Sequence, residues 1–82
     1  MKLPRDLSGL ELARLLERYG YEVTRQTGSH LRLTSTAQGT EHHISIPRHA
    51  FLRVGTLSSI LAEVATHLGR ERTDVAEELF GT

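Results

Sequence analysis

Apolar and polar residues alternate along this chain with two different periods, and the places where the period changes predict the order of its elements. Near the start, apolar residues recur three and four positions apart, as on one face of a helix: Leu12, Leu15, Leu16 and Tyr19. Ser8 and Glu11 form a capping-box pair at the beginning of this stretch, and Gly20 follows it where a left-handed residue commonly ends a helix. We therefore predict a helix over residues 8–19.

The period then shortens to two residues, which is typical of strands with one buried face. The alternation covers residues 21–26, 30–34 and 43–46, with apolar positions at Tyr21, Val23, Leu31, Leu33, Ile44 and Ile46. Gly28 and Gly39 mark turns between these stretches, and Pro47 ends the third because proline cannot donate to a strand ladder. We predict an antiparallel meander with one apolar face. Its opposite face would carry His30, Arg32, Thr34, His43 and Ser45.

Helical periodicity returns after Gly55. Apolar residues again recur at helical spacing, at Leu57, Ile60, Leu61, Val64 and Leu68. We predict that Thr56 caps this helix, that Gly69 ends it, and that Thr73-Asp74 caps a last short helix. The order α-β-β-β-α predicts an α+β fold, a two-layer sandwich in which both main helices cover the apolar face of the sheet. The other face of the sheet would be open to solvent.

The composition restricts how such a small fold is held together. The 82 residues include no cysteine, so the core contains neither a disulfide nor a thiolate zinc site. No apolar stretch approaches the roughly 20 residues that cross a membrane, and the first residues lack the apolar core of a signal peptide. We expect one domain, residues 1–82, in a soluble cytoplasmic protein.

Ten basic and ten acidic side chains give a formal net charge of zero, which at first argues against a nucleic-acid partner. The charges are distributed unevenly, however: residues 1–22 sum to zero, residues 23–55 to +3 and residues 56–82 to −3. The middle segment also contains four of the five histidines, which are His30, His42, His43 and His49. A polyanion would therefore be attracted to the middle segment alone.

His30 is the first candidate for chemistry. It directly follows a Gly–Ser turn, and strand parity places it on the polar face with Arg32 and Thr34. Histidine has a reference pKa of about 6.5, which suits proton transfer at neutral pH, and arginine binds phosphate oxygens. This combination suits the cleavage of a phosphodiester, whereas the alternative is a surface histidine in a hairpin.

RNA is the phosphodiester that a single histidine could cleave. Its 2′-hydroxyl is an internal nucleophile, so the protein has only to position the chain, stabilise charge and transfer a proton. The middle segment contains one acid, Glu41, and therefore no carboxylate pair that would hold Mg²⁺. We expect cleavage that needs no metal and no other cofactor.

The histidines permit another interpretation, a metal-binding regulator. His30, His43 and His49 could converge in space, although the sequence has no metal-ligand spacing. His42 and His43 are adjacent and point to opposite faces of a strand, so they cannot chelate one ion together. His67 lies near the end of a helix, where a partly protonated imidazole is favourable for the helix dipole. We expect no metal site.

A basic loop that contains Arg48, His49 and Arg53 leads into the second long helix. A helix N-terminus can bind phosphate through its free N–H groups, but the loop could equally be a solvated connection. The double-stranded-RNA-binding fold has this same order of elements and uses lysines at the start of its second helix. Residues 56–59 contain no lysine, so we do not expect duplex binding of that kind.

Five short motifs occur in order over residues 3–64: Leu7-Ser8-Gly9, Tyr19-Gly20-Tyr21, Gln26-Thr27-Gly28-Ser29-His30, Ile46-Pro47 with His49, and Gly55-Thr56-Leu57 with Ile60-Leu61. Together they resemble the HicA (YcfA-like) toxins of type II toxin–antitoxin systems. The resemblance implies a double-stranded-RNA-binding-like fold and a ribosome-independent toxin that cleaves mRNA. It also implies a HicB-like antitoxin that covers the active site, and it carries the catalytic role onto His30.

The residues and the resemblance lead to one working hypothesis, an endoribonuclease toxin in which His30 is the general acid/base. The residues expected to bind RNA are Arg25, Gly28, Ser29, Arg32 and Arg48. His43 and His49 are candidates for the second proton transfer. His43 is expected on the same face of the sheet as His30, and His49 lies in the nearby loop.

Two features depart from the family pattern. Residues 65–82 form a longer, acidic C-terminal extension, which could bind a partner, and Thr27 stands where the family is often basic. The alternative function is a non-catalytic RNA- or protein-binding module with the same fold, which the neutral net charge favours. A complex that is insensitive to salt would indicate a protein partner, because phosphate contacts weaken steeply as salt rises.

Overall fold

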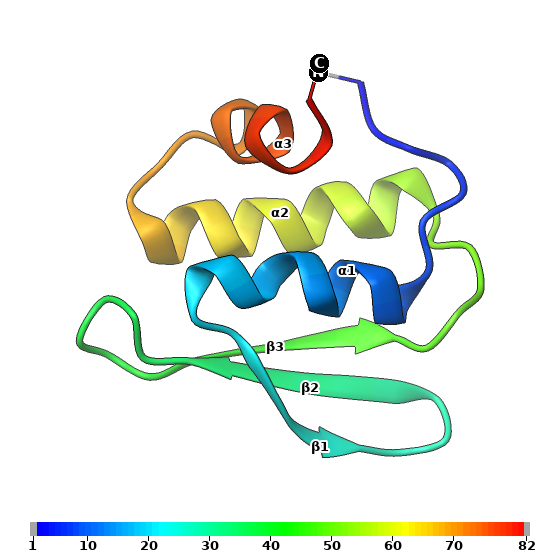
Figure 1. Cartoon of the computed structure of the whole chain (residues 1–82), viewed down its shortest axis with the longest axis horizontal. Helices are drawn as coiled ribbons and strands as arrows, with labels where there is room; N and C mark the ends of the chain where they lie inside the picture. Colours follow the sequence, from blue (N-terminus) through cyan, green and yellow to red (C-terminus); the bar gives the residue numbers. More distant parts are fainter. Residues whose placement is uncertain (1, 82) are drawn as a thin grey trace.

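Helices cover one face of a three-stranded antiparallel sheet. The computed structural model of the protein describes residues 2–81. Its elements are α1 (Gly9–Leu16), a 3₁₀ turn (Glu17–Tyr19), β1 (Glu22–Gln26), β2 (His30–Ser35), β3 (His42–Pro47), α2 (Val54–Leu68) and α3 (Arg72–Phe80). The strands lie in the order β1-β2-β3, and Figure 1 shows α1, α2 and α3 on the same side of this sheet. The predicted α+β sandwich is confirmed.

The core lies between the sheet and the first two helices. α1 contacts all three strands, α2 contacts β3, and α3 packs against α2. The largest fully buried side chains include Leu12, Leu16, Leu31, Leu33, Ile46, Leu57, Leu61 and Val64. These residues come from the positions that the two periodicities predict to be apolar, so the alternation in β2 and β3 and the helical stripes are confirmed.

The start of α1 forms as its sequence predicts. The Ser8 hydroxyl accepts a hydrogen bond from the Glu11 N–H at 3.0 Å, and the Glu11 carboxylate accepts one from the Ser8 N–H at 3.0 Å. This backbone bond lowers the pKa of the Glu11 carboxyl, because it stabilises the charged form. The helix tightens into the 3₁₀ turn and ends at Gly20, whose φ of 85° is left-handed.

The predicted starts of the last two helices are wrong by two or three residues. α2 begins at Val54 with Arg53 as its N-cap, so Thr56 lies inside the helix. α3 begins at Arg72 after Glu71, not at Thr73-Asp74, and neither helix has a side-chain cap. Backbone contacts determine both starts: the Arg53 carbonyl accepts the first helical hydrogen bond of α2, and the Glu71 carbonyl accepts that of α3.

β1 differs from the predicted strand because it forms an edge of the sheet. All of its residues are exposed, and Val23, expected on the apolar face, is 40% exposed. Val23 pairs with Leu33 and Arg25 pairs with Arg32, so Thr24 is an extra residue in β1 and forms a β-bulge. The bulge reverses which side of the sheet the following residues face.

The loop between β3 and α2 is fastened to the start of α1. The Gly9 N–H donates to the His49 carbonyl at 3.0 Å, and the Leu52 N–H donates to the Leu7 carbonyl at 2.8 Å. A Cβ atom on Gly9 would overlap the carbonyl oxygen of Pro47, so only glycine permits this close approach. The loop therefore has a defined position, although most of its side chains are exposed.

The acidic C-terminal segment is part of the folded structure. Val75 and Ala76 of α3 are fully buried in the common core. Glu78 accepts hydrogen bonds from the Tyr19 hydroxyl and, at 2.9 Å, from Arg70, and these bonds lower the pKa of the Glu78 carboxyl. Figure 1 shows α3 beside α2, on the side away from the sheet.

Candidate functional site

His30 lies immediately after the tight turn between β1 and β2. The Thr27 N–H donates to the His30 carbonyl at 2.9 Å, and the Thr27 hydroxyl accepts from the His30 N–H at 3.0 Å. Gly28 borders open space, since a Cβ placed on it would meet no atom within 4 Å. The turn is thus fixed by Thr27, and a large ligand can reach it without obstruction.

The imidazole of His30 is exposed on the open face of the sheet, as strand parity predicts. Its Nδ1 lies 2.9 Å from the Ser29 hydroxyl, and its Nε2 has no hydrogen-bond partner among the described residues. A ring whose Nδ1–H donates to the serine oxygen carries its free lone pair on Nε2. The side chain therefore presents one basic nitrogen to solvent.

Two arginines lie side by side on the same face. Arg25 and Arg32 are direct cross-strand partners, and neither forms an ion pair with a carboxylate in the part of the chain that the structure describes. Strict alternation from Val23 would turn Arg25 toward the helices, but the bulge at Thr24 places it next to Arg32. The result is an unneutralised pair of cations close to His30 along β2.

Arg48 connects the β3–α2 loop to this turn. Its N–H donates to the Ser29 carbonyl at 2.8 Å, and its guanidinium donates to the Thr27 carbonyl at 3.2 Å. His49 follows directly in the chain and is exposed. The fold thus gathers all six of the residues that the sequence proposes for the site on the turn and the adjacent open face: Arg25, Gly28, Ser29, His30, Arg32 and Arg48.

His43 belongs to a separate group on the open face. It pairs across the sheet with Thr34, four residues along β2 from His30, a separation of about 13 Å at the usual rise of a strand. The Thr34 hydroxyl lies 2.8 Å from its Nδ1, and Glu41 lies 2.7 Å from its Nε2. The structure therefore does not bring His43 to His30, and His49 is the candidate for a second proton transfer that stays near the turn.

A protein-family model matches the part of the chain that contains this site. The family model described as "HicA toxin of bacterial toxin-antitoxin" matches residues 9–65, more than half of the chain. The chain belongs to the HicA toxin family. Searches of curated proteins and of solved structures gave no match. Membership makes the protein the toxin of a toxin–antitoxin system, and such a system implies an antitoxin partner.

The family match ends at residue 65, in the last turn of α2. It contains the turn, the open face of the sheet and the β3–α2 loop, and so includes every residue of the proposed site. α3 lies beyond the match. The segment outside the match is packed on α2.

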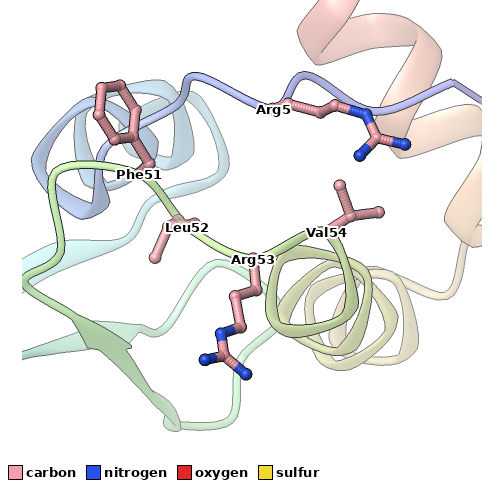
Figure 2. Close-up of a pocket in the computed structure, with 5 residues that line it drawn as sticks. All are labelled: Arg5, Phe51, Leu52, Arg53 and Val54. Atoms are coloured by element: carbon pink, nitrogen blue, oxygen red, sulfur yellow. The ribbon is translucent and has the colours of Figure 1, made fainter.

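A shallow hollow lies beside the start of α2. It is lined by Arg5, Phe51, Leu52, Arg53 and Val54 (Figure 2). Phe51 is 67% exposed although the neighbouring Leu52 is almost completely buried. The sequence pattern singles out Arg53 in this loop but not Phe51. The available signal was its position: an aromatic residue between Pro47 and α2 that belongs to neither a helical nor a strand period.

The other end of the toxin contains a group of aromatic rings that the sequence did not reveal. The His42 and His67 rings stack with centroids 4.6 Å apart and planes 12° apart, and the Tyr21 hydroxyl lies 2.7 Å from the His42 Nδ1. Burial raises the pKa of Tyr21 to about 12, and Glu63 adds to this through its negative charge. Burial and the adjacent His42 lower the pKa of His67. His42 and His43 do point to opposite faces, as predicted.

No group of three or more histidine, cysteine, aspartate or glutamate side chains within residues 2–81 is arranged to hold a metal ion. Over the same residues, no helix is long and apolar enough to cross a membrane.

Proposed function

We propose that this HicA toxin is a metal-independent endoribonuclease that cleaves mRNA in the cytoplasm, with His30 as the general acid/base. The observation that carries the proposal is the arrangement around His30. Its Nδ1 is paired with Ser29, its Nε2 is exposed, and two unneutralised arginines share its face of the sheet. A base beside paired cations suits a phosphodiester chain better than a small molecule, because the His30 side chain is exposed on an open face of the sheet.

The chemistry requires one nucleophile that RNA itself provides. His30 Nε2 removes the proton from a 2′-hydroxyl, whose oxygen then attacks the adjacent phosphorus. The bond from phosphorus to the 5′-oxygen breaks, and the products are a 2′,3′-cyclic phosphate and a 5′-hydroxyl. The leaving oxygen takes a proton either from the imidazolium of His30 or from His49, which follows Arg48 at the edge of the turn.

The surrounding residues position the RNA and stabilise its charge. Arg32 and Arg25 offer planar donors to the phosphate oxygens, where negative charge increases during the attack. Arg48 keeps further guanidinium donors available while one of them holds the Thr27 carbonyl. Gly28 adds no side chain to the turn, so the RNA backbone can approach His30 closely.

We further propose that the antitoxin partner is HicB-like and covers this same face. The open side of the sheet is not covered by any helix of residues 2–81, so a second protein can reach it (Figure 1). A protein bound there would contact His30 and the arginines and exclude RNA. Cleavage assays with and without the co-purified partner test this part of the proposal.

The decisive experiment is cleavage of a single-stranded RNA by purified toxin. We expect His30→Ala to slow cleavage by about 10²–10⁴-fold, the usual contribution of a general acid–base group. His43→Ala serves as the matched control, since it removes a histidine from the same face and should leave cleavage nearly unchanged. The products should end in a cyclic phosphate, and RNA with a 2′-deoxy substitution at the cleaved position should resist.

Two outcomes would contradict the proposal. If His30→Ala cleaves RNA as fast as the wild type, or is equally toxic when expressed in bacteria, His30 is not the acid/base group. If the folded wild-type protein binds RNA without cleaving it, the alternative of a non-catalytic binding module holds instead. A complex that forms equally well in low and high salt would identify that module as one for protein.

A further inference from the structure

Phe51 is an aromatic residue held in solvent by a loop that is itself well anchored. The flanking residue Leu52 is buried, and its N–H donates to Leu7, while His49 on the other side accepts from Gly9. The Phe51 ring is 67% exposed, the largest fraction among the exposed large apolar side chains of residues 2–81. A flexible loop could fold such a ring inward, but here the backbone on both sides is fixed. The ring is therefore presented outward by the fold.

Two arginines, Arg5 and Arg53, line the same hollow as Phe51. Figure 2 shows Phe51 against the blue helix α1, with the Arg5 side chain extending above Val54 and the Arg53 side chain pointing to the other side of the loop, both away from the ring. No acidic residue occurs between Glu41 and Glu63, whereas Asp6 precedes α1 and Glu11, which is bonded to Ser8, lies in its first turn. An exposed aromatic ring beside a hollow that two arginines line is complementary to a polyanion that also has flat apolar rings.

This surface is continuous with the turn that carries His30. Arg48 bonds to Ser29 and Thr27, and Phe51 follows it by three residues, so the two lie at most about 11 Å apart along the chain. Figure 1 shows the β1–β2 turn and the β3–α2 loop at the same end of the molecule. A strand that occupies the turn can extend over the loop.

We infer that Phe51 is a stacking platform for a base of single-stranded RNA, with Arg53 and Arg5 binding the flanking phosphates. This inference rests on the proposed function, since it extends the path of the RNA from His30 to the hollow beside α2. Proteins bind single strands in this way, by combining a basic groove with aromatic rings on which bases stack. Every base can stack, so the platform accepts any sequence. Phe51 would therefore contribute to the affinity for RNA and help to place the RNA chain on His30.

A tryptophan at position 51 provides a direct test, because the chain contains no tryptophan. In the His30→Ala background, which leaves the RNA uncut, Phe51→Trp places a single fluorophore on the proposed platform. We expect a short single-stranded RNA to quench its fluorescence as the base stacks. The matched control is Val23→Trp, also at an exposed apolar position but paired with the inward-facing Leu33, and its fluorescence should not change.

Affinity measurements test the energetic side of the inference. With the same RNA, Phe51→Ala should weaken binding about 5- to 150-fold, the range reported for loss of one stacked base, and Phe51→Tyr should restore most of it. Arg53→Gln and Arg5→Gln should each reduce the slope of log affinity against log salt by about 0.7. Arg18→Gln is the control, since Arg18 follows α1 at the end opposite Gly9 and should leave the slope unchanged.

The outcomes separate this inference from the proposed function. Quenching at position 51 together with weaker binding by Phe51→Ala supports the platform. If RNA is bound and cleaved normally while position 51 shows neither effect, the inference is overturned and the proposed function stands. If no RNA is bound or cleaved, the inference and the proposed function both fail.

If the co-purified antitoxin changes the fluorescence at position 51 and RNA does not, the surface around Phe51 is a protein interface and the inference is overturned. Circular dichroism of Phe51→Ala verifies that the variant is folded.

Discussion

Arg25 and Arg32 face each other across β1 and β2 as direct cross-strand partners, with no carboxylate of residues 2–81 in an ion pair with either. Like charges in this position destabilise a sheet, so a fold selected only for stability would place an acid or a hydroxyl at one of the two positions. The bulge at Thr24 creates the pairing, because regular alternation would put Arg25 on the other side of the sheet. The arrangement suits a surface that receives negative charge from outside the protein.

Replacing one arginine of this pair should improve stability and impair RNA binding. We expect Arg25→Thr to raise the free energy of unfolding by about 0.2–1 kcal/mol, because it removes the repulsion and threonine suits a strand. The same change should reduce the salt slope of RNA binding by about 0.7. Urea denaturation and salt titrations measure the two effects. Arg25→Lys keeps the charge and should show neither, and a loss of stability in Arg25→Thr would contradict the argument.

The close approach of α1 to the end of β3 gives a second prediction. Gly9→Ala should lower the free energy of unfolding by about 1–3 kcal/mol, because its methyl group would overlap the Pro47 carbonyl and push the helix away. Gly55→Ala is the matched control, since position 55 lies in α2 and has open space around it. That change should stabilise the protein by about 0.4–1 kcal/mol. Urea denaturation of both variants measures their free energies of unfolding. If the two substitutions change this free energy equally, α1 does not depend on the contact with Pro47.

The parts of the fold that local sequence determines could be predicted well. The capping box of Ser8 and Glu11 and the alternation that buries Leu31 and Leu33 depend on neighbours a few residues away, and both occur as expected. The same alternation placed His30 on the open face. These features need only the period of a helix or a strand, which the sequence displays directly.

Features that depend on distant residues could not be read in this way. The bulge at Thr24 arises in the pairing of β1 with β2, and no residue type in β1 predicts it. The stacked pair of His42 and His67 joins residues 25 positions apart, so it appears only once α2 lies over β3. Phe51 is exposed because its neighbours are fastened to α1, a contact that the sequence of the loop does not contain.

The acidic C-terminal segment should contribute to stability even though it lies outside the family match. Val75→Ala should lower the free energy of unfolding by about 2 kcal/mol, because Val75 is fully buried and loses two methyl groups. Glu77→Ala, at an exposed position of the same helix, should have almost no effect. Thermal and urea denaturation of both variants measure the difference. If Val75→Ala is as stable as the wild type, α3 is only loosely attached and could bind a partner instead.

The stacked histidines predict a dependence of stability on pH. His67 faces the His42 ring, the Tyr21 ring and the Ser35 hydroxyl, and Glu63 lines the hollow beside His42. Burial, together with His42, lowers the pKa of His67 below the ordinary value of 6.5. The unfolded chain therefore binds a proton at a higher pH than the folded protein does. This contribution to stability is complete above pH 6.5 and is lost as the pH falls through the lowered pKa of the folded state.

We therefore expect the wild type to lose stability between pH 7.5 and pH 5, and His67→Gln to lose less over the same range. Glutamine retains a hydrogen-bonding group for Ser35 but cannot take up a proton in this range. Urea denaturation at several pH values measures both slopes, and the difference between them isolates His67 from the other titrating groups. The lowered pKa values of Glu11 and Glu78 act below pH 4.5, outside this window. An unchanged slope in His67→Gln would show that the stacked pair does not resist protonation.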